Sequence, residues 1–144
     1  MPGLTETALA RFDQGYNCSQ SVFSAFAPQF GVPDELALKL ASPFGGGMAR
    51  QGHICGAVSG ALMALGAGRG ADLPAGKEEI YRLGQELLQS FESRHGTLLC
   101  RELIGYDLRT PDGWMQARQK GVFTTICPGL VRDAVEIAQA LLKP

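Results

Sequence analysis

The stretch ICGAVSGALMALGAG, residues 54–68, decides the fold of this chain. It is the longest apolar stretch, but its length of about 15 residues falls short of the roughly 20 that a membrane-spanning helix needs. Small residues recur every four positions, at Gly52, Gly56, Gly60 and Ala64. On a helix such residues form one stripe with almost no side chain. Because each glycine inside a helix costs about 1 kcal/mol, the stripe favours a central helix that packs very close to a neighbour.

Outward from this stretch, the rest of the chain is also predicted to be helical. Residues 43–48 (PFGGGM) form a loop before the central helix, since three consecutive glycines readily adopt positive φ. Helicity is expected to resume near His53 and to run to about Gly66. Apolar residues recur at helical spacing elsewhere, and no useful alternating strand pattern is present. The sequence predicts an all-α fold, a compact bundle of about six or seven helices in one domain, residues 1–144.

Composition and charge exclude several classes of function. The chain has 144 residues, of which 45% are hydrophobic and 19% charged, and this is typical of a globular protein. The formal net charge is -1, and the basic residues are scattered, so neither nucleic acid nor an anionic membrane is an expected partner. The first ten residues carry Glu6 and no apolar run, so no signal peptide is expected. We therefore expect a cytoplasmic protein.

Four cysteines are the strongest candidates for chemistry: Cys18, Cys55, Cys100 and Cys127. Their separations are 37, 45 and 27 residues, so the short C-x-x-C pair of zinc ribbons and thioredoxins is absent. In the cytoplasm, cysteines outside disulfides are often catalytic, redox-sensing or metal-binding. Scattered cysteines are also common as small buried hydrophobic residues. Spacing alone is compatible with all of these roles.

Local context favours reactive thiols at three of the four positions. Cys18 follows Asn17, a good helix-capping residue. Cys55 comes in the first turn after the glycine-rich loop, and Cys127 precedes Pro128, which suits a first helical position. At a helix start, the macrodipole and the free N–H groups favour a thiolate, so lowered thiol pKa values are expected there. The glycine stripe would also hold Cys55 close to another cysteine or a bound group, although packing alone explains it too.

Five motifs along the chain occur in a familiar order. They are YNCSQ (16–20), FGGGM (44–48), CGAVSGA (55–61), CRELIG (100–105) and Cys127. Together they resemble the C_GCAxxG_C_C family of redox-active proteins, over about residues 16–142. The second cysteine motif departs from the family name, because here the cysteine precedes the glycine. The resemblance implies that the four cysteines are the family's signature residues. It also implies an electron-transfer or thiol partner protein, because some members are fused to electron-transfer modules.

Other candidate site residues lie close to Cys55 in the sequence. His53 is two residues away and could ligate a metal or act as a base to a thiol, although a surface histidine is the plainer interpretation. Glycines before a helix could cradle an anion, and a nearby arginine could hold an anionic ligand or cluster. These candidates for cofactor binding are Gly45, Gly46, Gly47 and Arg50.

Three functions fit these observations. The first is a thiol-based oxidoreductase or electron-transfer protein that cycles cysteine pairs between thiol and disulfide, for which four cysteines allow three pairings. The second is a zinc or iron–sulfur site that uses all four thiolates as ligands. The third is a non-catalytic helical binding or assembly module, in which the glycine stripe and apolar helices build a core or a homodimer interface. The helix-start positions favour the first two.

Overall fold

The fold is all-helical, as expected, in the computed structural model, which describes residues 3–144. The first two residues of the expected 1–144 domain lie outside this range. Within it there is no β-strand, only an isolated bridge between Ile54 and Leu99. The α-helices are α1 (Leu4–Asp13), α2 (Cys18–Phe26), α3 (Asp34–Ala41), α4 (Gly56–Arg69), α5 (Lys77–His95), α6 (Cys100–Ile104), α7 (Pro111–Gln119), α8 (Val122–Thr125) and α9 (Cys127–Leu142), and the 3-10 helices are η1 (Ala27–Phe30), η2 (Ser42–Phe44) and η3 (Pro74–Gly76).

The expected count of about six or seven helices was too low, since the described residues form nine α-helices. Helix α6 has 5 residues and α8 has 4, and such single turns are too short to show the apolar period that identifies a helix in a sequence. Helix α4 begins at Gly56 rather than near His53, because the chain between η2 and α4 is a loop. No helix within residues 3–144 is both long and apolar enough to cross a bilayer.

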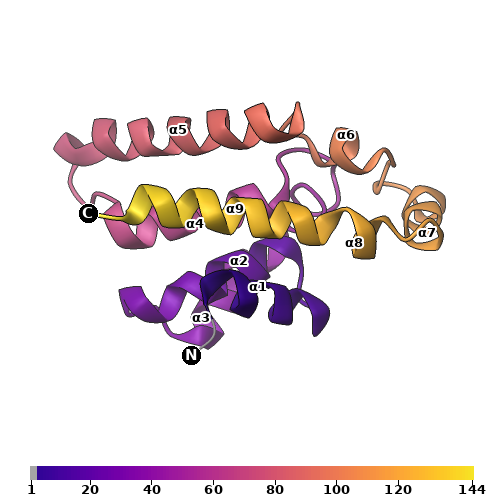
Figure 1. Cartoon of the computed structure of the whole chain (residues 1–144), viewed down its shortest axis with the longest axis horizontal. Coiled ribbons are helices and arrows are strands. Elements are labelled where there is room, and N and C mark those ends of the chain that lie inside the picture. Colours follow the sequence, from indigo (N-terminus) through magenta and orange to yellow (C-terminus); the bar gives the residue numbers. More distant parts are fainter. Residues whose placement is uncertain (1–2) are drawn as a thin grey trace.

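Helix α4 lies at the centre of the fold and packs against α2, α5 and α9 (Figure 1). Its glycine stripe faces α2. A Cβ atom on Gly60 would lie 2.6 Å from the carbonyl oxygen of Ser19, and one on Gly56 would lie 3.3 Å from the Cβ of Cys18. The two backbones are therefore closer than any larger residue would allow. This close approach brings the first turn of α2, with Cys18, beside the start of α4.

Local interactions fix where α2 begins and ends. The Asn17 side chain accepts a hydrogen bond of 2.9 Å from the Gln20 N–H, and the Gln20 side chain accepts one of 3.1 Å from the Asn17 N–H. This capping box sets Cys18 as the first helical residue. The helix ends at Phe26, and Pro28 lies in the 3-10 turn that follows, where its ring and missing N–H do not allow the α-helix to continue.

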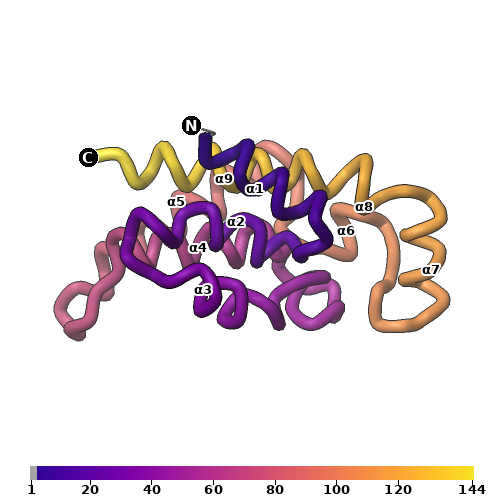
Figure 2. The backbone as a smooth tube through the Cα atoms, turned by 90° about the horizontal axis from the view of Figure 1, so that it is seen from below, coloured from indigo at the N-terminus to yellow at the C-terminus, as the bar shows by residue number. Residues whose placement is uncertain are grey.

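The buried apolar residues form two clusters. The larger cluster lies between α1, α2, α4, α5 and α9 and includes the fully buried Phe26 and Phe91. The smaller cluster includes Cys100 and Cys127 and is built by α6, α7, α8 and the start of α9, at one end of the molecule (Figure 2). Cys18 is half-buried and packs against both clusters. The cysteines therefore gather at the junction between the two clusters.

Candidate functional site

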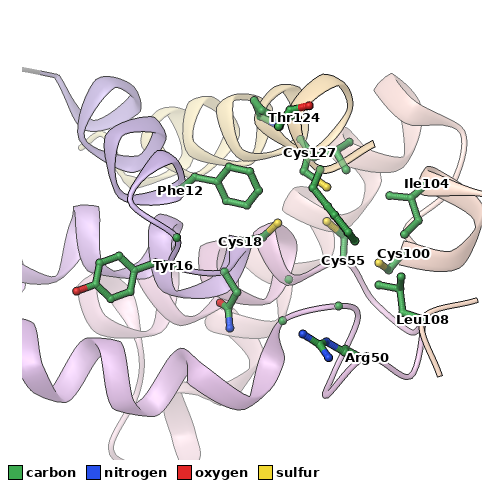
Figure 3. Close-up of a pocket in the computed structure, with 18 of the residues that line it drawn as sticks. Phe12, Tyr16, Cys18, Arg50, Cys55, Cys100, Ile104, Leu108, Thr124 and Cys127 are labelled. Carbon is green, nitrogen blue, oxygen red and sulfur yellow. The ribbon is translucent and has the colours of Figure 1, made fainter. Parts of the chain in front are cut away.

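Each of the four cysteines lies at the start of a helix. Cys18, Cys100 and Cys127 are the first residues of α2, α6 and α9, and Cys55 immediately precedes α4. The sequence indicated three of these positions, and Cys100 is the fourth. All four line one cavity of about 1060 Å³, and their sulfur atoms turn toward its interior (Figure 3). Residues far apart in the sequence thus share a single site.

The cavity has an apolar wall and a charged rim. Cys55, Cys100 and Cys127 are buried, Cys18 is half-buried, and all four are free thiols. The larger apolar side chains of the wall are Phe12, Ile104, Leu108, Trp114 and Phe123. The charged residues that line the cavity are Asp13, Arg50 and Arg132, which are exposed. The thiols are therefore reached through a polar opening but sit against apolar surface.

Cys18 and Cys127 are neighbouring thiols whose ionisation is linked. The interaction with the Cys18 thiol lowers the pKa of Cys127 even though burial acts to raise it. The same interaction is the largest cause of a strongly raised pKa at Cys18, followed by burial and by the charges of the other thiolates. Cys127 is therefore the thiol that ionises first, and Cys18 holds the proton that stabilises its thiolate.

Cys55 and Cys100 are carried by two chain segments that pair side by side. The Cys55 N–H donates to the Leu98 carbonyl at 2.9 Å, and the Cys100 N–H donates to the His53 carbonyl at 2.7 Å, on either side of the isolated bridge. Burial raises the pKa of Cys55 to about 11 and that of Cys100 to about 12. Both thiols therefore stay protonated at neutral pH.

The expectation of lowered thiol pKa values at helix starts was wrong for Cys18 and Cys55. At Cys55, the N–H groups of Ala57 and Val58 do act to lower the pKa, but burial outweighs them, and neither forms a capping hydrogen bond with the sulfur. At Cys127 the pKa is lowered, but the cause is the Cys18 thiol rather than the helix. Burial in the apolar wall is thus the stronger influence on these thiols.

The glycine-rich loop forms a left-handed turn beside the cavity. The five residues from Gly46 to Arg50 all have positive φ, between 50° and 68°, although Met48, Ala49 and Arg50 are not glycines. Every N–H from Met48 to His53 donates to a carbonyl within residues 43–48. These N–H groups, which follow the three glycines, are therefore all engaged within the loop.

The three loop glycines have different places. Gly45 and Gly46 line the cavity, whereas Gly47 is buried outside its lining. A Cβ on Gly47 would lie 2.7 Å from the Cβ of Cys100, so Gly47 allows the loop to pack directly on that cysteine. The loop thus supports the site mainly through its shape and its close approach to Cys100.

Arg50 and Trp114 meet where this loop reaches the cavity. The Arg50 guanidinium lies over the Trp114 ring, 5.1 Å from its centroid, and Arg50 projects from the loop below the cysteines (Figure 3). The guanidinium of Arg118 also stacks on Trp114, at 5.5 Å, but Arg118 does not line the cavity. Sequence reasoning missed Trp114 and Phe123 as parts of the site. Trp114 is the one tryptophan of the chain, and this is the sequence feature that could have pointed to it as a site residue.

The predicted metal ligands are only partly brought together, because the four cysteines share the cavity and His53 does not. His53 is exposed and is not among the residues that line the cavity, so only its backbone carbonyl supports the site. Among residues 3–144, no group of three or more Cys, His, Asp or Glu side chains is arranged to hold one metal ion. A structural zinc or iron–sulfur site takes four such ligands at bonding distance. The four cysteines, as placed here, do not fit that group.

Comparison with known proteins identifies the family. Residues 16–141 match the family described as "Putative redox-active protein (C_GCAxxG_C_C)", and this span contains all four cysteines. No curated protein and no solved structure gives a significant match. Because the match covers most of the chain and every element that carries a cysteine, the chain belongs to the C_GCAxxG_C_C family.

Proposed function

We propose that this protein exchanges thiols with disulfides, with Cys127 as the nucleophile and Cys18 as the resolving thiol. The observation that carries the proposal is that Cys18 and Cys127 line the same cavity, pack in the same cluster and influence one another's ionisation. Two thiols in one cavity wall can be joined once their sulfur atoms are brought to the roughly 2.05 Å of a disulfide bond. The pKa of Cys127 is lowered, and a thiolate is the form that attacks a disulfide.

The first step forms a mixed disulfide. The Cys127 thiolate attacks one sulfur of a disulfide RSSR, the S–S bond breaks, and one RS⁻ leaves with the electron pair and takes a proton from water. In the second step Cys18 loses its proton to water and attacks the Cys127 sulfur, which releases the second RS⁻. One RSSR is thereby reduced to two RSH, and the two cysteines are oxidised to a disulfide. The reverse exchange with a thiol compound or thiol protein regenerates the pair.

The contact between the two thiols also explains the order of events. The pKa of Cys18 is raised chiefly by its interaction with Cys127. Once Cys127 is bound in the mixed disulfide, its negative charge is gone and it no longer needs the proton of Cys18. The largest cause of the raised pKa then disappears, and Cys18 becomes a better nucleophile at the step in which it is required.

Cys55 and Cys100 are expected to react later or not at all. Their pKa values of about 11 and about 12 leave very little thiolate at neutral pH. Their place in the cavity wall keeps them within reach of a slower rearrangement, but the first disulfide is predicted to join Cys18 and Cys127.

Thiol counting and trapping test the proposal. The reduced protein has four free thiols, and oxidation by a small disulfide should reduce the count to two. Cys18→Ser should trap a mixed disulfide on Cys127, identified by peptide mass spectrometry, whereas Cys127→Ser should form none at a comparable rate. Cys100→Ser is the matched control, and oxidation should reduce its count of free thiols from three to one. A wild-type count that stays at four, or rapid reaction of Cys127→Ser, would overturn the proposal and favour the assembly role.

A further inference from the structure

We infer that the disulfide substrate is a small acidic molecule and that Arg50, stacked on Trp114, binds its carboxylate. This inference rests on the proposed function and adds the class of substrate. The cavity of about 1060 Å³ is of the size that small ligands occupy, at the upper end of the usual range. Cys127 is only 6% exposed, so a disulfide on the surface of a folded protein could not easily reach it. A small molecule can enter the cavity and bring its sulfur atoms to the thiol pair.

The charges around the cavity favour an acidic molecule. Two of its three charged lining residues are arginines, Arg50 and Arg132, and the third is Asp13. Between residues 3 and 144, neither arginine forms an ion pair with a carboxylate of the chain. The attacking group is itself negative, so an acidic substrate needs positive groups nearby to offset the repulsion. A guanidinium is well suited to this, because it can bind a carboxylate with two parallel hydrogen bonds.

Arg50 differs from an ordinary surface arginine because the structure holds it in place from two sides. Its guanidinium lies over the Trp114 ring, and its backbone N–H donates to the Gly45 carbonyl at 3.0 Å. Its backbone is in the left-handed region with φ 63°, as are those of Met48 and Ala49. Such a conformation is unfavourable for residues with a side chain and is common at binding sites. The turn thus uses an unfavourable backbone to present Arg50 at the cavity.

Arg118 provides an internal comparison. It stacks on the same ring at nearly the same distance as Arg50, 5.5 Å against 5.1 Å. It does not line the cavity, however, and it belongs to α7 rather than to the left-handed turn. A general effect of positive charge near Trp114 should therefore appear in both residues. An effect of substrate binding should appear in Arg50 alone.

The test compares three alkyl disulfides that differ in charge. These are 3,3′-dithiodipropionate with two carboxylates, bis(2-hydroxyethyl) disulfide with none, and cystamine with two ammonium groups. The rate at which the reduced protein consumes each one is divided by the rate of the same disulfide with dithiothreitol, which removes differences in intrinsic reactivity. We expect a normalised preference of about tenfold for the acid over cystamine at low salt, which weakens as the ionic strength rises.

The variants assign the preference to a residue. Arg50→Gln should lower the ratio of the acid rate to the neutral rate about fivefold, and Arg118→Gln should leave this ratio at its wild-type value. Circular dichroism verifies that both variants are folded. Equal normalised rates for the three disulfides, or equal effects of the two variants, would overturn the inference while the proposed function stands. If no disulfide is reduced, the proposed function itself fails, and the inference fails with it.

Discussion

The contact between Gly60 of α4 and Ser19 of α2 offers a direct test of how the site is held together. A Cβ on Gly60 would lie 2.6 Å from the Ser19 carbonyl oxygen and 3.1 Å from the Ser19 Cα. Since ordinary contacts begin near 3.4 Å, Gly60→Ala requires the two backbones to separate by about 0.8 Å. Overpacking of this kind costs about 1–3 kcal/mol. The Ser19 atoms are backbone atoms that cannot rotate away, so the cost is expected near the upper end of this range. A gain in helix propensity of about 1 kcal/mol partly offsets that cost.

The net expectation for Gly60→Ala is a loss of about 2 kcal/mol in the free energy of unfolding, or a fall of roughly 4–8 °C in Tm. Gly66→Ala is the matched control, because Gly66 lies in the same helix and nothing approaches its Cβ position within 4 Å. It should stabilise the protein by about 0.5–1 kcal/mol. Urea unfolding gives both values. If the two variants have the same stability, the close approach of α2 to α4 does not depend on Gly60, and the reasoning fails.

Three further predictions concern the loop and the thiols. Ala49→Gly should raise the free energy of unfolding by about 0.5–1 kcal/mol, because Ala49 has φ 50°. The control Ala140→Gly in α9 should lower the free energy of unfolding by a similar amount. If both variants lower the free energy of unfolding, the turn is not strained at Ala49. Cys18→Ala removes the thiol whose interaction lowers the pKa of Cys127. Alkylation of Cys127 by iodoacetamide should therefore slow near neutral pH and its pH profile should shift upward, and an unchanged profile would refute this. Because the folded-state pKa of Cys55 is raised from 9.0 to about 11, its contribution to stability is complete below pH 9 and is lost as the pH rises toward 11; urea midpoints that stay constant over this interval would contradict the burial of its thiol.

The helix starts at the cysteines were largely predictable because their causes are local. Asn17 caps α2 through its own side chain, and Pro128 occupies the second position of α9, so both signals lie next to the cysteine they place. Cys100 lacks such a neighbour, since the N-cap residue of α6 is Leu99 and makes no side-chain cap. Its helix start therefore left no local signal.

Features that depend on the assembled fold were not predictable. The glycines at 46–47 indicate a loop, but the left-handed turn continues through Met48 and Arg50 because hydrogen bonds within the folded loop compensate for its conformation. The thiol pKa of Cys55 depends on a balance between helix N–H groups, which a sequence reveals, and burial, which it does not. The same holds for Trp114, whose role depends on a wall formed by distant segments.

The wide spacing of Cys18 and Cys127 has a further consequence for the energetics of the proposed pair. A disulfide between them would close a loop of about 110 residues, and such a link stabilises a folded chain by about 4–5 kcal/mol, mainly through the unfolded state. Thermodynamic linkage is reciprocal, so the folded chain must favour the disulfide over the two thiols by the same amount more than the unfolded chain does. The site would therefore be oxidised more readily in the folded chain, and a change that populates the unfolded chain would make it more reducible.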